Sequence, residues 1–296
     1  KRSVSTERVK NLMKKIYTRI NDLPNRIKDS FIIAWAIVGL ISTILSVLGW
    51  SLGSFSQLSI VGRIAIVIAV LIGMVVIVYL ILGSIFKDAI SLYINNTAVS
   101  VECGDIFNAP EWRVIGVDTH FDTRVDDIII SVGSLHGKLV LDHGDRAEID
   151  YVVECEAQKR GLQKDEDGLY DFPLGTVIKY ESSIDQHIYL MAAISKLDKK
   201  HKARTNMEEY ERMLMNMWKE LDGIYASHDI VMPILGMGIT RFDGPKDKEG
   251  LLRCMLCTLN NSRISFNSKI KVMIYGDSKD VPLYEFRNMF RSSIRR

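Results

Sequence analysis

Two long uncharged segments constrain the fold of this chain more than any other feature. Residues 31–52 and 64–86 are runs of 22 and 23 residues without a charged side chain. At about 1.5 Å per residue, each would form a helix roughly 33 Å long, enough to cross a hydrocarbon core of about 30 Å. A buried hairpin in a soluble core is the alternative, but soluble helices of this length normally carry a polar stripe. The sequence therefore predicts a transmembrane hairpin over residues 30–87.

The charges on either side of the hairpin predict its orientation. Residues 1–29 carry nine basic and three acidic side chains, a net charge of +6, whereas Arg63 is the only charged residue between Asp29 and Lys87. The whole chain has a net charge of +2, so the remaining residues carry −4. By the positive-inside rule, the leader and the long C-terminal part both lie in the cytoplasm. The four cysteines would then be free thiols.

The leader and the two spans have patterns of their own. Apolar residues recur at helical spacing from Val9 to Ile20 among basic ones, which predicts an amphipathic helix on the anionic inner leaflet or against the soluble domain. The spans contain no ionisable side chain, which disfavours a transporter. Small residues such as Ala65, Ala69 and Gly73 favour close helix packing, either within one hairpin or between copies.

The C-terminal part alternates between strand-like and helix-like segments from about residue 98 to residue 296. This alternation predicts an α/β domain with a mixed sheet between helices. The expected strands are 99–103, 113–117, 127–132, 176–181, 188–195, 229–235 and 269–275. A first expected helix begins at a capping box over 205–208 and continues with an apolar face at Tyr210, Met213, Met217 and Leu221. Two further helices are expected over about 246–259 and 281–294. Ligands of such folds bind beyond the carboxyl ends of strands.

Three of the loops at strand ends suit a nucleotide. The strand at 229–235 leads into Gly236-Met237-Gly238, where missing Cβ atoms allow backbone N–H groups to face a diphosphate. Asp105 follows a strand and could accept a hydrogen bond from an adenine amino group. Residues 133–137 form a second glycine-bounded loop. Each loop can also be interpreted as a simple turn, and the absence of Gly-Lys-Ser/Thr disfavours a P-loop nucleotidase.

Two further patterns predict no site. Cys254 and Cys257 have the spacing of metal ligands, but no second pair follows and both fit one face of a helix, so we expect packing and no metal. The basic run at 196–204 lacks aromatic residues for base stacking. We interpret it as a solvated loop and expect no nucleic-acid partner.

Taken together, the loops resemble those of a macro domain, the ADP-ribose-binding module. Gly104-Asp105-Ile106 looks like the adenine-contacting step of that family, and residues 233–239 are similar to its phosphate loop. More narrowly, residues 121–123, 134–137, 173–176 and 233–242 resemble the macro-like domain that follows two membrane spans in the effector of the bacterial Thoeris anti-phage system. This resemblance covers nearly the whole chain. The expected fold is thus a transmembrane hairpin followed by a macro-like three-layer α/β/α domain with a mixed sheet.

The resemblance implies a sensor in the bacterial inner (plasma) membrane. In that family a partner TIR-domain enzyme converts NAD into an ADP-ribose-derived signal, histidine-ADP-ribose for macro-domain effectors. The effector then assembles into a homo-oligomer and damages the lipid bilayer. Carried over to this sequence, Asp105 and Ile106 would hold the adenine, two loops would wrap the diphosphate and distal ribose, and Tyr275 would add an aromatic contact. The two loops consist of Gly133, Ser134, Leu135, His136 and Gly137, and of Gly236, Met237, Gly238, Ile239, Thr240 and Arg241. Arg241 could pair with a phosphate or a carboxylate of the signal.

One departure from the family pattern bears on catalysis. Hydrolytic macro domains carry Asn-Ala-Ala-Asn beside a run of glycines, whereas residues 117–122 here read Val-Asp-Thr-His-Phe-Asp without such a run. We therefore expect binding without turnover and no catalytic residue. The alternative is a membrane-tethered ADP-ribosyl hydrolase with Asp118, His120 or Asp122 as base. A passive anchor that recruits a partner is a third possibility.

Overall fold

The chain divides into two compact units, which we describe separately. The structure is a computed structural model that describes residues 24–49, 59–86, 88–197, 203–238, 241–242, 246–276 and 281–290. The units are Lys1–Lys87 and Asp88–Arg296. The second unit therefore begins ten residues before the expected boundary at residue 98. The expected leader helix over residues 9–20 lies outside the described residues.

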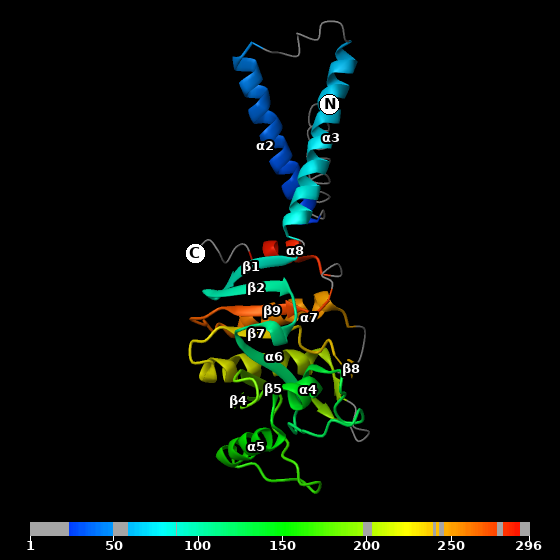
Figure 1. Cartoon of the computed structure of the whole chain (residues 1–296). Coiled ribbons are helices and arrows are strands. Elements are labelled where there is room, and N and C mark those ends of the chain that lie inside the picture. Colours follow the sequence, from blue (N-terminus) through cyan, green and yellow to red (C-terminus); the bar gives the residue numbers. More distant parts are fainter. Residues whose placement is uncertain are drawn as a thin grey trace, which may run out of the picture. The chain divides into compact units, whose positions relative to one another are not determined.

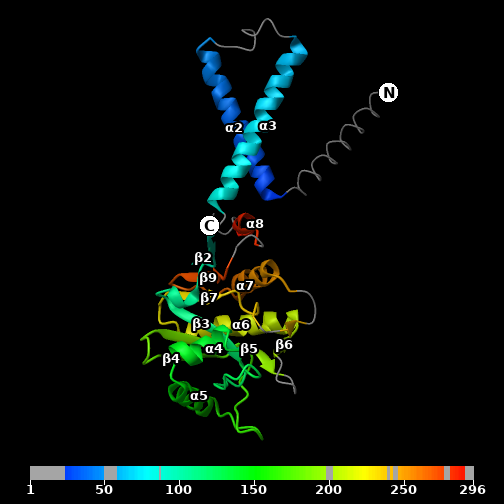
Figure 2. The same cartoon turned by 45° about the vertical axis from the view of Figure 1, so that its right-hand side comes forward.

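The described residues of the N-terminal unit form two helices, α2 (Asn25–Val47) and α3 (Ile60–Ile85). Both are long and apolar enough to cross a membrane. Helix α2 begins directly after Pro24, so its charged first turn precedes the apolar run that begins at Phe31. The helices are in contact at Arg26 and Tyr79 and splay apart towards Val47 and Ile60 (Figures 1 and 2). Most of their large apolar side chains are exposed.

Arg26 joins the two helices near the start of α2. Its Nε and Nη2 atoms donate hydrogen bonds to the carbonyl oxygen of Tyr79 at 3.0 and 2.6 Å. Its guanidinium carbon lies 3.7 Å from the centroid of the Tyr79 ring. Gly83 follows one helical turn later, and a Cβ atom there would overlap the guanidinium. The absence of a side chain at Gly83 is therefore what allows Arg26 to reach the backbone of α3.

The C-terminal unit is built on a mixed sheet with the order β1-β2-β9-β7-β3-β5-β6-β8, and β4 also pairs with β5. Five neighbouring strands, β2, β9, β7, β3 and β5, run parallel. Strands β1 and β4 are antiparallel to their neighbours. The strands are β1 (Ala89–Ile94), β2 (Thr97–Cys103), β3 (Trp112–Asp118), β4 (Val177–Glu181), β5 (Ile188–Leu197), β6 (Ala203–Thr205), β7 (Ile230–Pro233), β8 (Arg241–Phe242) and β9 (Ile270–Ile274).

Helices cover both faces of this sheet (Figure 1). Helix α5 (Arg146–Arg160) packs against β4 and β5, and its buried cluster includes Ile115 and Val117 of β3. Val114 points to the other face, as alternation along a strand requires. There α6 (Met207–Ile224) and α7 (Lys248–Ser262) pack together, while α8 (Leu283–Met289) contacts β1. Short turns complete the unit: η2 (Ile106–Asn108), α4 (Leu135–Lys138) and η3 (Leu139–His143). The expected three-layer α/β/α fold is confirmed.

The strand predicted at 127–132 does not form. Asp126 Oδ1 instead accepts hydrogen bonds from the N–H groups of Ile128 and Ile129 at 2.9 and 2.8 Å. Asp127 Oδ1 accepts one from Val132 N at 2.9 Å, and Asp127 has a left-handed backbone with φ of 59°. Because these carboxylates bind N–H groups that a strand would pair with a neighbour, the apolar run Ile128–Ile130 folds as a turn.

One predicted helix starts at a different residue, and one helix was not predicted. The capping box is formed by Asn206 and Glu209, one residue later than predicted, although the expected apolar face of α6 is buried. Helix α5 was not predicted at all. It begins with a cap by Asp145, ends at Gly161 with φ of 67°, and buries only Ile149, Val153 and Ala157. Such a narrow apolar stripe is a weak sequence signal.

Candidate functional site

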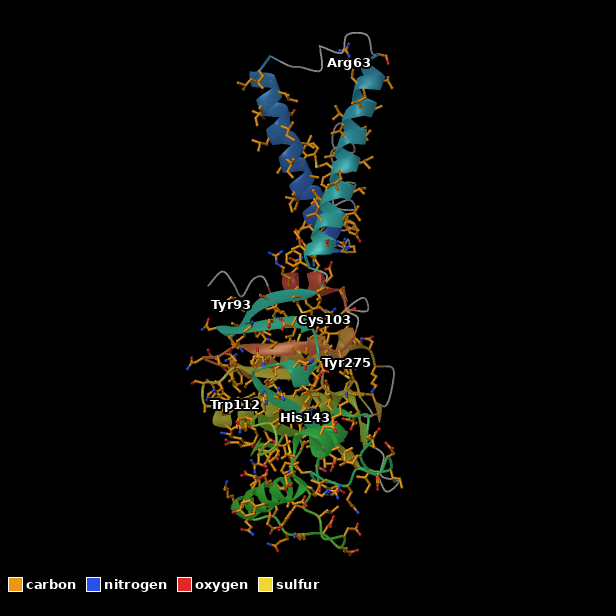
Figure 3. All side chains as sticks on the ribbon, viewed as in Figure 1. Arg63, Tyr93, Cys103, Trp112, His143 and Tyr275 are labelled. Atoms are coloured by element: carbon orange, nitrogen blue, oxygen red, sulfur yellow. The ribbon has the colours of Figure 1, made fainter. Side chains whose placement is uncertain are left out.

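The expected ligand segments follow four strands that are neighbours in the sheet. Asp105 comes after β2, Tyr275 after β9, the Gly236 loop after β7, and residues 119–137 after β3. Because these strands are parallel, their carboxyl ends share one side of the sheet. Figure 3 shows Cys103 and Tyr275 on that side, opposite Trp112 at the start of β3. The fold thus brings together segments that are up to 170 residues apart in the sequence.

The segment after β2 is held in a fixed turn. Gly104 N donates a hydrogen bond to Ile274 O at 3.1 Å, which ties it to the end of β9 beside Tyr275. Asp105 Oδ1 accepts from Phe107 N at 3.0 Å and thereby caps η2. The Asp105 side chain is half-buried, and Ile106 is buried. A carboxylate has a second oxygen, with which Asp105 could accept a hydrogen bond from a ligand amino group.

The loop after β7 contains a glycine in the left-handed conformation. Gly236 has φ of 82°, a conformation that favours glycine, and an added Cβ atom would lie 3.2 Å from the Phe242 ring. Gly238 is exposed, and no described atom outside its neighbours lies within 4 Å of its Cβ position. Ile239 and Thr240 lie outside the described residues, and of Arg241 only the backbone, in β8, is described.

Lys246 fixes this loop and was missed by the sequence reasoning. Its Nζ donates hydrogen bonds to the carbonyl oxygens of Gly236 and Gly238 at 3.0 and 2.9 Å. Burial lowers the pKa of the Lys246 ammonium. Because a trans peptide points its N–H away from the preceding carbonyl, the N–H of Met237 is directed away from Lys246. A lysine eight to ten residues after Gly-x-Gly was the available sequence signal.

The loop at 133–137 divides into an accessible part and an inward part. Ser134 Oγ accepts from Gly137 N at 2.9 Å and donates to Ser131 O at 2.7 Å. A Cβ atom on Gly137 would overlap the carbonyl of Ser131, so this glycine is required by close packing. Gly133 is exposed, and Ser134 and Leu135 are half-buried, but His136 and Gly137 are buried.

His136 belongs to a buried group of ionisable side chains beneath the loop. Burial lowers the pKa of the His136 imidazole, although Asp118 and Asp122 nearby oppose this. Burial raises the pKa of the Asp118 carboxyl, which accepts a hydrogen bond from His120 N at 2.8 Å. Burial by itself would raise the pKa of Asp122, but hydrogen bonds from Arg124 hold it below its ordinary value. At neutral pH, His136 is thus an uncharged support of the loop.

With this geometry established, the chain can be compared with known proteins. A family model described as Thoeris protein ThsA, Macro domain, matches residues 99–275, more than half of the chain. The chain belongs to this family. The macro domain named by the match contains every expected ligand residue from Asp105 to Tyr275. The resemblance drawn from the sequence motifs is therefore confirmed.

The chain is similar to Thoeris protein ThsA of Bacillus amyloliquefaciens (strain Y2), with 29% identity over 245 residues that cover 77% of this chain and 80% of that protein. Among solved structures, the Oceanobacillus iheyensis macrodomain with ADP has 13% identity and a TM-score of 0.45, and the alignment covers 70% of this chain and 98% of that chain. The same macrodomain with MES bound gives 13% identity and a TM-score of 0.45, over 71% and 100%.

The three possible bases of the macro domain differ in how they are held. His120 Nδ1 lies 3.0 Å from the Tyr170 carbonyl oxygen, and Asp122 forms a 2.6 Å ion pair with Arg124. Both side chains therefore have structural partners. Asp118 lies at the end of β3, where it is buried and accepts the hydrogen bond from His120 N.

Cysteines of the macro domain do not gather into a site. Cys254 is buried in α7, where burial raises the pKa of its thiol to about 12, and Cys257 is half-buried on the same helix. Their predicted role in helix packing agrees with these positions. Across the described part of the chain, no group of three or more His, Cys, Asp or Glu side chains could hold a metal ion.

Proposed function

We propose that this chain is a membrane-anchored receptor whose macro domain binds an ADP-ribose-derived nucleotide. One observation carries the proposal: four loops with the residue types of a nucleotide site follow four adjacent parallel strands, inside the region that matches the ThsA macro-domain family. The proposed signal is histidine-ADP-ribose made by a partner TIR-domain enzyme, as the Thoeris resemblance implies. The likeness to a curated Thoeris protein supports this assignment.

In the proposed complex, the adenine lies against Asp105 and Ile106. The diphosphate lies between the Gly236–Gly238 loop and residues 133–135. Because Lys246 binds the loop carbonyls, the Met237 N–H is available to a phosphate oxygen. The chain beyond residue 29 has a net charge of −4 and offers no general attraction for an anion. Recognition would therefore depend on these local amides, with Arg241 and Tyr275 at the distal end.

Ligand binding would be coupled to the membrane through assembly. Helices α2 and α3 would span the inner membrane, with both termini and the macro domain in the cytoplasm. A ligand can promote assembly only if it binds the assembled state more tightly than the separate chains. Association of several hairpins would then disrupt the bilayer and stop phage propagation by abortive infection.

Calorimetry on the full chain in detergent micelles tests the binding step. We expect ADP-ribose to bind, and Gly238→Ala to bind it equally well because the Cβ position is open. Gly238→Glu would place a carboxylate beside the phosphates and should weaken binding by more than tenfold, or about 1.4 kcal/mol. Absence of binding to the unmodified chain, or equal binding by the Glu and Ala variants, would remove this loop from the proposal.

Two assays separate the proposal from its rivals. A receptor without turnover should release no ADP-ribose from an ADP-ribosylated substrate. Release that Asp118→Asn abolishes would instead support a tethered hydrolase. Addition of the conjugated signal should cause dye leakage from liposomes that contain the chain, whereas a passive anchor would cause none.

A further inference from the structure

Strand β4 is an open edge of the mixed sheet. Among the strands that the structure describes, β4 pairs with β5 alone. Hydrogen bonds from Ala193 N to Thr176 O and from Ser182 N to His187 O show that even-numbered residues of this segment face β5. The direction of the N–H and C=O groups alternates along a strand. The backbone groups of Val177, Lys179 and Glu181 therefore point outward, and such an edge can accept another strand.

Helix α5 runs beside this open edge. A groove of about 540 Å³ lies between the helix and the strand. Its lining residues are Ala147, Glu148, Tyr151 and Val152 of α5 and Lys179, Tyr180 and Glu181 of β4. Tyr151 is 69% exposed and lines this groove. A groove between an edge strand and a helix is the setting in which extended segments add to a sheet.

The charges on β4 indicate which segment fits. Lys179 and Glu181 are both exposed, and within the described part of the chain neither forms an ion pair. The Lys179 ammonium lies 4.3 Å from the centroid of the Trp112 ring. If two copies of β4 pair antiparallel about Tyr180, Lys179 lies opposite Glu181 of the partner subunit. Opposite charges in directly facing positions stabilise a strand pair, and like charges destabilise it.

The backbone selects the same register. Pairing about Tyr180 places outward-facing residues opposite outward-facing residues, as a hydrogen-bonded ladder requires. The two neighbouring registers that also meet this requirement are centred on Lys179 and on Glu181, and each puts two like charges face to face. The strand is thus self-complementary in one register, through both its hydrogen bonds and its charges.

We propose that β4 is a homodimerisation edge, at which two C-terminal units join into one continuous sheet centred on Tyr180. The edge lies at the opposite end of the sheet from β1 (Figures 1 and 2), so pairing leaves the ligand loops at the carboxyl ends of the strands uncovered. The dimer itself rests only on β4 and α5. Its role as a step of membrane assembly rests on the proposed function.

Charge reversal in the full chain, solubilised in detergent, tests the pairing by analytical ultracentrifugation. Lys179→Glu leaves two acidic residues on the strand, and Glu181→Lys leaves two basic ones. We expect each variant alone to dimerise at least tenfold more weakly than the unmodified chain. An equimolar mixture of the two should recover dimers, because every facing pair in the heterodimer is again opposite in charge. The double variant with both changes should form homodimers by itself.

A merely structural effect of either substitution could not be rescued by mixing. The inference is overturned if the unmodified chain is monomeric with and without ADP-ribose, if the single variants dimerise normally, or if the mixture stays monomeric. ADP-ribose calorimetry on the same samples distinguishes the two proposals. Loss of dimers with retained binding supports the edge and leaves the receptor proposal intact. Rescue by mixing without any ADP-ribose binding would support the edge and contradict the receptor proposal.

Discussion

The N-terminal unit and the C-terminal unit use the same residue types in opposite ways. Trp35 of α2 is 63% exposed, whereas Trp218 of α6 is 1% exposed and donates a 3.1 Å hydrogen bond to Thr258 of α7. Among the described residues of the hairpin, only Ser30, Ala34 and Val78 are buried. In a hairpin that crosses a membrane, apolar side chains would gain nothing by leaving lipid for a helix interface, so such a hairpin needs no core. The C-terminal unit is stabilised by removing such side chains from water.

Side-chain caps occur in both units. Helices α5, α6 and α7 begin at Asp145, Asn206 and Asp247, whose side chains each accept a backbone N–H bond. In the hairpin, α3 begins at Ser59, whose side chain accepts from Gly62 N, whereas α2 begins at Pro24 without a side-chain cap. Arg26 joins the two hairpin helices through the backbone of α3. Four substitutions can break or sharpen the contrast in burial between the units.

The largest effect is expected from Trp218→Ala. Removing a fully buried Trp should lower the free energy of unfolding of the C-terminal unit by about 3–5 kcal/mol. The matched change Trp35→Ala, on an exposed side chain, should change it by less than about 0.5 kcal/mol. Urea unfolding in detergent, followed by circular dichroism at 222 nm, measures both. Equal losses would mean that the two units do not differ as described.

The second effect depends on pH. Burial lowers the pKa of His136 in the folded state, so below an unfolded pKa of about 6.5 the unfolded state binds a proton that the folded state does not. The contribution of this group to the free energy of unfolding is therefore lost as the pH falls below 6.5. The loss is about 1.4 kcal/mol per pH unit while the folded imidazole stays neutral. In the variant His136→Gln, this contribution to the slope of the free energy of unfolding against pH should vanish between pH 6.5 and 5.

The exposed His228 is the matched control for this experiment. His228→Gln should leave the slope as it is in the unmodified chain. If both variants have the same slope as the unmodified chain, His136 is not buried in a neutral state.

A smaller effect is expected at the cap of α6. Asn206 accepts from Glu209 N at 2.9 Å, and Asn206→Ala should destabilise the C-terminal unit by about 1 kcal/mol. Asn206→Asp keeps an acceptor oxygen and should restore most of the loss. The same urea titration applies, and an Asp variant as unstable as the Ala variant would contradict the capping role.

The smallest effect is expected in the hairpin itself. Arg26→Ala removes interhelical hydrogen bonds, which contribute about 0.6 kcal/mol on average in membrane proteins. We expect a broader distance distribution between nitroxide labels at Ile32 and Leu80, both exposed, in lipid. Arg63→Ala is the control, because it removes another arginine of the hairpin without touching this contact. An unchanged distribution in Arg26→Ala would show that another contact holds the helices together.

The sequence predicted the fold better than it predicted individual contacts. The capping residues, the Met213 and Met217 stripe and the strands around Gly104 and Gly236 had periodic or positional signals. The segment 127–132 misled, because its isoleucines have strand propensity while Asp126 and Asp127 bind the backbone locally. Helix α5 gave almost no amphipathic signal, since it buries only three residues.

Within the candidate site, the sequence indicated the loops but not the roles of their residues. His136 was expected at the ligand, yet it is buried beneath the loop with Asp118. Lys246 was not expected, yet it holds the Gly236–Gly238 carbonyls. Neither side-chain direction nor a hydrogen bond across ten residues follows from residue type and spacing.

The sequence by itself determined which parts of the chain suit lipid and which suit water, because length, charge and hydropathy act locally and add along the chain. It also determined the family, through short motifs at strand ends. Only the tertiary structure decided that the loops after β2, β9, β7 and β3 meet at one side, that His136 turns inward, and that β4 is left open. These outcomes depend on strand order and packing between distant residues, which no local pattern encodes.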